Sequence, residues 1–82
     1  MSEHNTQWEA EYTDTFGGES NYSWVRRATF NVPWNARRSL VMRRAKRELG
    51  LSGLRGRTSD YGDMLEFRPY GRCTILFVNV SY

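Results

Sequence analysis

The sequence predicts an α+β fold, in which an antiparallel β-sheet of four to five strands carries one amphipathic helix packed across it, in the order ββα(β)ββ. Apolar and polar residues alternate in the segments before and after residues 36–49, and this period of two is typical of strands with one buried face. Residues 36–49 repeat apolar side chains at helical spacing instead. Because the strand segments flank one helix rather than alternating with several, an antiparallel sheet is favoured.

Two strands joined by a tight turn are expected in the N-terminal part. Residues 8–14 alternate apolar and polar side chains, and residues 22–32 do so once a one-residue slip near Val25 is allowed. The Gly17-Gly18 pair between them is a turn signal, since glycine adopts positive φ angles without strain. A glycine-rich loop can also hold a phosphate, but that use requires a helix after the loop, and a strand is expected here. A hairpin turn is the better interpretation.

The helix is expected from about Ala36 to Leu49. Pro33 ends the preceding strand because it has no amide hydrogen to donate. Asn35 is a suitable N-cap and Gly50 a suitable C′ residue. The stripe of this helix that would face the sheet consists of Val41, Met42, Ala45 and Leu49.

Further strands are expected towards the C-terminus. A short segment over residues 55–58 is followed by residues 64–68, which alternate as a strand, and by a turn over residues 69–72. Residues 73–80 are apolar on both faces, which is typical of a central strand. Cys73 is therefore expected to be a small buried hydrophobe. As the only cysteine it cannot form a disulfide within the chain, which fits a reducing compartment.

The 82 residues are expected to form one domain, with a flexible N-terminus over residues 1–7 and a single α+β domain over residues 8–82. Aromatic residues make up 15% of the chain, which provides large apolar side chains for a core. No apolar run approaches the roughly 20 residues that a bilayer span requires. Residues 1–20 also lack the apolar stretch of a signal peptide. We therefore expect a cytoplasmic protein with no membrane partner.

The net charge of +3 is distributed unevenly. All 12 Lys and Arg residues follow Asn21, and only Lys46 among them is not arginine. The arginine bias favours fixed contacts with carboxylates or phosphates, although a GC-rich genome enriches arginine without a functional reason. Residues 1–20 contain no Lys or Arg and five acids, which are Glu3, Glu9, Glu11, Asp14 and Glu19.

No catalytic residue, cofactor or metal site is predicted. His4 is the only histidine, so the expected domain has no imidazole to activate a serine or cysteine, and no zinc site is expected. Asp60 and Asp63 could form a carboxylate pair, but they lack the repeated oxygen ligands of a calcium loop. A solvated turn, or an ion pair with Arg55 or Arg57, is the favoured interpretation. We expect a protein that is not an enzyme.

The basic side of the helix is the main candidate for a function in nucleic-acid binding. Five cations there could neutralise phosphates, each contact steepening the salt dependence of duplex binding by about 0.9 logarithmic units. Trp34 and Tyr61 would add stacking if they lie beside the helix. The same cations could instead form a solvated face paired with Glu9 and Glu11, or contact an acidic protein. The five are Arg37, Arg43, Arg44, Lys46 and Arg47.

A protein–protein interaction module is the alternative function. Phe16 and Tyr22 flank the glycine pair and would anchor such a module to a host bacterial factor, since aromatic residues are frequent hot spots of interfaces. A homodimer formed through an exposed edge strand is a third interpretation. The oligomeric state is not predicted by the sequence.

Three segments carry a resemblance to a known group. Residues 12–27 include Thr-Asp-Thr-Phe-Gly-Gly-Glu followed by Asn-Tyr-Ser-Trp-Val, and residues 44–55 and 60–64 add a second part. Together they resemble small uncharacterised proteins encoded by bacteriophages and prophages, over roughly residues 9–80. The resemblance implies a phage accessory protein in the host bacterial cytoplasm. It supplies no catalytic or binding residue, and it favours binding over catalysis by association only.

Overall fold

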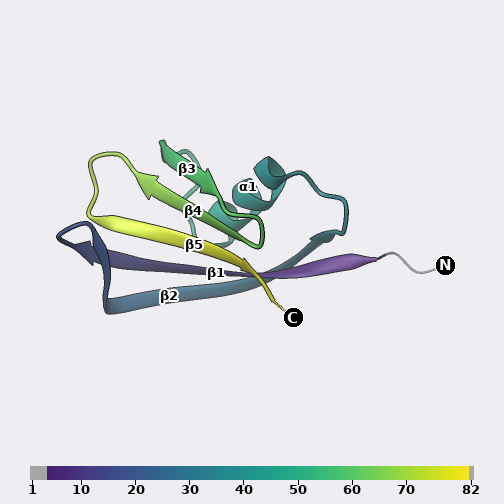
Figure 1. The fold of residues 1–82 in the computed structure, drawn as a ribbon, viewed down its shortest axis with the longest axis horizontal. Helices are drawn as coiled ribbons and strands as arrows, with labels where there is room; N and C mark the ends of the chain where they lie inside the picture. Colours follow the sequence, from purple (N-terminus) through teal and green to yellow (C-terminus); the bar gives the residue numbers. More distant parts are fainter. Residues whose placement is uncertain (1–3, 82) are drawn as a thin grey trace.

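A computed structural model describes residues 4–81 and has one helix packed against a five-stranded sheet whose neighbouring strands are all antiparallel. The strand order is β2-β1-β5-β4-β3, so β2 and β3 form the two edges (Figure 1). The α+β class and the predicted order of elements are confirmed. In chain order the elements are β1 (Asn5–Phe16), β2 (Glu19–Pro33), α1 (Arg38–Glu48), β3 (Gly56–Asp60), β4 (Met64–Pro69) and β5 (Thr74–Val80).

The long hairpin of β1 and β2 runs the length of the molecule, and the three shorter strands lie beside part of it (Figure 1). Residues 5–7, which were expected in a flexible terminus, belong to β1 and pair with β2, whereas residues 1–3 lie outside the described residues. The glycine pair forms the predicted turn, with φ angles of 64° at Gly17 and 87° at Gly18. β5 lies between β1 and β4, as expected for a central strand.

The two faces of the sheet have different roles. On one face, Trp8 and Ala10 of β1 lie opposite Phe30 and Ala28 of β2, and α1 packs over this covered face. The other face, here called the open face, carries the residues that alternate with these. Strand alternation therefore places nearly all of the apolar core on one side. The core consists of Trp8, Ala10, Tyr12, Phe30, Val32, Val41, Met42, Ala45, Leu49, Leu51, Leu65, Phe67, Leu76 and Val78.

The helix does not cover its face of the sheet evenly. The predicted apolar stripe is buried, and α1 contacts mainly β2 and β1. The part of the covered face formed by β4 and β3 therefore lies to one side of α1 (Figure 1). This offset positions the candidate site described below.

The N-terminal end of the helix differs from the prediction. Asn35 is not the N-cap, because Pro33 and Ala36 are joined by a backbone hydrogen bond of 2.9 Å that places Asn35 inside a turn. The N-cap is Arg37, whose side chain makes no capping hydrogen bond. The helix therefore begins at Arg38, two residues after the predicted start.

The C-terminal end of the helix matches the prediction. Gly50 has a φ angle of 73°, and its amide donates to the Arg47 carbonyl. The Leu51 amide donates to the Lys46 carbonyl at 2.7 Å, which completes a Schellman motif. The Arg26 Nη2 atom, from edge strand β2, donates to the Leu49 carbonyl at 2.7 Å. A cation from the sheet thus fixes the negative end of the helix.

Candidate nucleic-acid interface

The five predicted cations are not equivalent in the structure. Arg37, Arg43 and Arg47 are exposed, and within residues 4–81 none of them has an acidic partner. Arg43 and Arg47 lie one turn apart on α1, so their like charges are neighbours. We call the exposed cations Arg37, Arg43 and Arg47 the basic surface, and Arg43 and Arg47 form its centre.

The other two predicted cations make contacts within the protein. The Arg44 Nε atom donates to Glu48 Oε2 at 3.1 Å along the helix. Lys46 turns towards the sheet, where its Nζ atom donates to the Leu54 carbonyl at 3.2 Å and lies 4.2 Å from the ring centroid of Phe67. This cation–π contact desolvates part of the Lys46 side chain. The prediction of five equivalent outward cations is therefore wrong for Lys46.

Glu9 and Glu11 do not neutralise the helix. Both lie on the open face, since they alternate with the covered residues Trp8 and Ala10 along β1. Glu11 Oε2 accepts a hydrogen bond from Arg27 Nε at 3.0 Å and forms an ion pair with Arg27 Nη2 at 3.0 Å. The sheet separates these carboxylates from α1, so the basic surface keeps its charge.

Arg38 points towards the sheet. Its guanidinium carbon lies 5.3 Å from the Trp8 ring centroid, and its Nε atom lies 3.6 Å from Asp60 Oδ2 on β3. The sequence predicted a solvated turn at Asp60 and Asp63, or an ion pair with Arg55 or Arg57. Asp60 is exposed and accepts from the Gly62 amide, and its ion-pair partner is Arg38 rather than Arg55 or Arg57. No sequence pattern indicates the Arg38–Asp60 pair, because the pair depends on how α1 crosses the sheet.

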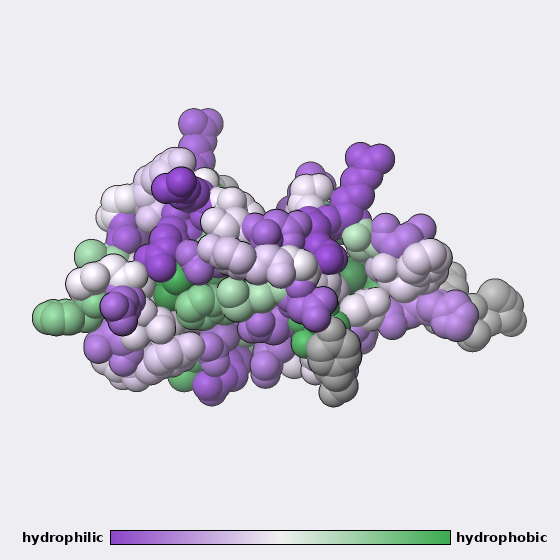
Figure 2. All heavy atoms as spheres, in the orientation of Figure 1, coloured by the Kyte–Doolittle hydropathy of each residue, from purple (hydrophilic) through white to green (hydrophobic). Residues whose placement is uncertain are grey.

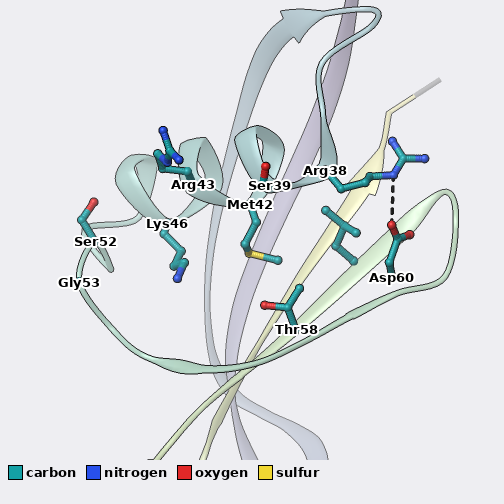
Figure 3. A pocket seen from close by; sticks show the side chains of 10 residues that line it. Arg38, Ser39, Met42, Arg43, Lys46, Ser52, Gly53, Thr58 and Asp60 are labelled. Atoms are coloured by element: carbon teal, nitrogen blue, oxygen red, sulfur yellow. Dashed lines mark ion pairs between the residues drawn. The ribbon is translucent and has the colours of Figure 1, made fainter.

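A hollow of about 460 Å³ lies between α1 and β3, where the helix leaves the sheet uncovered. Figure 3 shows Lys46 and Met42 pointing from α1 towards Thr58 of β3, with the Arg38–Asp60 pair at another point of the rim. The lining combines cations, hydroxyls and one carboxylate with apolar side chains. Its residues are Arg38, Ser39, Met42, Arg43, Lys46, Ser52, Gly53, Thr58, Asp60 and Leu65.

A second hollow of about 410 Å³ adjoins the first along α1. Arg43 and Ser52 line both hollows, so the two share a boundary at Arg43. In Figure 2, hydrophilic side chains project from the side of the molecule where β3 and α1 lie in Figure 1. The residues lining the second hollow are Leu40, Arg43, Arg44, Arg47 and Ser52.

The two aromatic residues expected to help binding are both exposed. Trp34 is 67% exposed in the turn before α1, and Tyr61 is 61% exposed directly after Asp60 at the end of β3. Tyr61 therefore follows a residue that lines the first hollow. Each ring is accessible for stacking.

The hairpin tip holds the residues predicted for a protein partner. Phe16 is 80% exposed beside the glycine turn. Tyr22 is 47% exposed, has a φ angle of 57°, and donates its hydroxyl to Glu11 Oε1 at 2.6 Å. A positive φ angle is uncommon for tyrosine and marks a locally strained backbone. The Phe16 ring is thus largely exposed, whereas the Tyr22 ring is fixed by its hydrogen bond to Glu11.

A bulge in β2 explains the conformation of Tyr22. Opposite the single residue Asp14 of β1, β2 carries residues 21–24 between its paired positions, where the sequence predicted a one-residue slip. The Asp14 carboxylate fixes this bulge by accepting hydrogen bonds from Asn21 Nδ2 and from the amide and hydroxyl of Ser23. Asp14 is a structural residue that the sequence did not single out.

The hairpin carboxylates also shift two pKa values. Hydrogen bonds from Ser23 and Asn21 hold the pKa of Asp14 far below its ordinary value of 3.8. The hydrogen bond from Tyr22 to Glu11 raises the pKa of the Tyr22 phenol above 10.0, because the phenolate would face a carboxylate. Both shifts favour the hydrogen-bonded hairpin at neutral pH.

Cys73 lies before β5 rather than within it and is exposed, so the expectation that it is buried is wrong. Across residues 4–81, no group of three potential metal-ligating side chains is present. In the same part of the chain, no helix combines the length and apolar character needed to cross a membrane.

Comparisons with protein-family models, curated proteins and solved structures find no match to this chain.

Proposed function

We propose that this protein binds nucleic acid through the exposed arginines of α1, and that it acts as a phage-type accessory protein in the bacterial cytoplasm. One observation carries the proposal. Arg43 and Arg47 are exposed without an acidic partner within residues 4–81, and Arg43 lines two adjoining hollows and Arg47 the second of them. Glu11 is bound to Arg27 on the opposite face of the sheet.

The roles of the cations differ. Arg43 and Arg47 would bind phosphates through their planar guanidinium groups, each releasing condensed counterions. Arg44 would exchange its pair with Glu48 for a phosphate at little cost, because a helical pair of this kind contributes only about 0.3–0.5 kcal/mol. Lys46 is held against Phe67 and Leu54, so it would contribute to the electrostatic field.

The test is a fluorescence-anisotropy titration with random-sequence DNA, single-stranded and duplex, at two salt concentrations. Binding should weaken as salt rises, and Arg43→Glu/Arg47→Glu should lose about 100-fold or more at low salt, because two phosphate contacts become repulsions. The matched control is Arg57→Glu/Arg72→Glu. It changes the net charge equally, at exposed positions that line neither hollow.

The control decides between a local site and net charge. Equal losses in the two double variants would mean that only the total charge matters, which contradicts the proposal. Binding that is insensitive to salt, or unchanged in Arg43→Glu/Arg47→Glu, would also contradict it. Circular dichroism of each variant checks that the fold is retained.

The hairpin tip supports the second candidate, a module that modulates a host protein. Phe16 is 80% exposed on a hairpin whose bulge is fixed by Asp14, so an apolar anchor is presented in a constrained position. A stoichiometric partner should be captured from nuclease-treated bacterial lysate by the parent and not by Phe16→Ala. Tyr70→Ala, at another residue that is 70% exposed, is the matched control. Capture that is unaffected by Phe16→Ala would refute this use of the tip.

A further inference from the structure

We infer that the bound nucleic acid is single-stranded and that one of its bases enters the hollow between α1 and β3. This inference rests on the proposed function and adds the class of ligand. It follows from the chemistry of the lining and from the exposed arginines, of which Arg43 lies at the boundary of the two hollows and Arg47 in the second.

The hollow has the size and composition of a site for a flat organic ring. Its volume of about 460 Å³ falls within the roughly 300–1,000 Å³ that small-molecule sites span. Met42 and Leu65, which are 5% and 1% exposed, supply apolar surface, and Thr58 supplies a hydroxyl on β3. A base could be covered by the apolar side chains and reach polar groups at its edge.

Asp60 gives the hollow a hydrogen-bond acceptor that suits a base. The lining also carries the cations Arg38, Arg43 and Lys46, but a carboxylate accepts hydrogen bonds from ring or amino N–H groups, which a phosphate lacks. Asp60 Oδ1 accepts a hydrogen bond from the Gly62 amide at 2.8 Å. Asp60 Oδ2 lies 3.6 Å from Arg38 Nε, which is longer than a hydrogen bond, so this oxygen can accept from a base.

The backbone of the strand would lie along the outer side of α1. Arg43 lines both hollows and Arg47 lines the second. A nucleic-acid strand that leaves the first hollow along α1 would therefore meet both guanidinium groups. Phosphates and a base therefore have separate, adjoining contacts. This division matches single-strand binding, in which a cationic track holds the backbone and apolar surfaces hold bases.

A duplex cannot use the hollow without breaking its own structure. Its bases are stacked and paired, and removing one costs a few kcal/mol. Duplex DNA would therefore contact only the exposed arginines, whereas a single strand would use the arginines and the hollow together.

The experiment compares a 12-nucleotide single strand of mixed sequence with the duplex of the same sequence, at one salt concentration. We expect the single strand to bind at least about tenfold more tightly, as one buried base would provide. Thr58→Trp, which fills the hollow without changing charge, should weaken single-strand binding about tenfold and leave duplex binding unchanged. Ser59→Trp is the control, because Ser59 is next to Thr58 on β3 and faces the open side of the sheet.

The outcomes separate the inference from the proposed function. Equal binding of single strand and duplex, or Thr58→Trp that binds the single strand like Ser59→Trp, overturns the inference and leaves nucleic-acid binding intact. No salt-sensitive binding to either form refutes the proposed function and the inference together. Ser39→Trp narrows the same hollow from α1 and repeats the test if Thr58→Trp fails to fold.

Discussion

Two arginines on the open face of the sheet and two on α1 have different electrostatic surroundings. On the open face, Arg27 binds Glu11 and Arg68 binds Glu66 at 2.8 Å. On the helix, Arg43 and Arg47 have no acidic partner within residues 4–81. The same residue type therefore stabilises a sheet in one region and leaves charge available in the other, so an arginine count alone does not identify a binding surface.

The geometry of the two elements causes this difference. Arg27 and Glu11 are directly opposite each other in the β1–β2 ladder, where cross-strand side chains meet. Arg43 and Arg47 are neighbours at helical i,i+4 spacing, where like charges cost about 0.2–0.5 kcal/mol. A bound anion would relieve that repulsion, while the open-face pairs have nothing to gain from one.

The largest expected effect is a difference between the two faces of the sheet in how much a truncated side chain lowers the free energy of unfolding. Leu76 is fully buried on the covered face, so Leu76→Ala should lower the free energy of unfolding by about 2–5 kcal/mol. Phe77, the next residue of β5, faces the open side and is only partly buried, so Phe77→Ala should cost less. Urea unfolding of both variants is the measurement. A larger loss for Phe77→Ala would show that the open face carries a core of its own.

The second prediction concerns binding. The logarithm of the association constant for duplex DNA falls as the logarithm of salt concentration rises, and Arg43→Ala/Arg47→Ala should make this negative slope shallower by about two, one unit for each lost phosphate contact. Arg27→Ala/Arg68→Ala removes the same charge from the open face and should leave the slope within error of the parent. Equal changes of the slope in the two double variants would show that arginines on α1 and on the open face contribute alike to DNA binding.

The third prediction concerns the free energy of unfolding of two single variants, in which the open-face arginine should matter more than the helical one. Arg27→Ala should lower the free energy of unfolding by about 0.2–1 kcal/mol, because it removes a partly exposed ion pair. Arg43→Ala should remain within about 0.5 kcal/mol of the parent, as for other surface changes without a partner. Chemical denaturation monitored by tryptophan fluorescence can resolve the difference. A greater loss for Arg43→Ala would reveal a structural role for that residue.

The smallest effect is expected at Asp14 in acid. Its pKa is depressed, so its carboxylate stabilises the folded state at pH values above the ordinary pKa of 3.8 and loses this contribution as the pH falls through the folded-state pKa. Asp14→Asn should lower the melting temperature at pH 7, and the gap to the parent should shrink as the solution becomes strongly acidic. Glu19→Gln, in the same hairpin, is the control. A difference in melting temperature between Asp14→Asn and the parent that stays constant with pH would show that the charge of the Asp14 carboxylate does not stabilise the hairpin.

Local patterns predicted most of the fold. Alternating side chains identified the strands, and Gly17-Gly18 and Gly50 marked a turn and a helix end because their positive φ angles suit glycine. Asn35 failed as an N-cap because a turn from Pro33 competes for the same residues. Capping propensity is local, whereas the choice between adjacent caps depends on where the chain leaves β2.

The candidate site was predicted only in part. The exposed arginines follow from the apolar stripe, since a buried side forces the opposite side outward. The inward turn of Lys46, the Arg38–Asp60 pair and the hollow depend on the sideways offset of α1 over the sheet. The sequence also left undecided the side on which Glu11 lies relative to α1. These features arise from tertiary geometry, which no short-range pattern encodes.

The position of β5 between β1 and β4 has a consequence for how the chain folds. β1 and β2 form a local hairpin, but Trp8 pairs with Val80, so the two central strands come from opposite ends of the described chain. Contacts of such long sequence separation require a large loop to close before they contribute, and this slows folding. β3, β4 and β5 each pair with the strand next to them in sequence, so the β1–β5 ladder is the pairing that joins the β1–β2 hairpin to these three strands. Without this ladder, β1 and β5 would each have an open edge, and with it the two parts form one sheet.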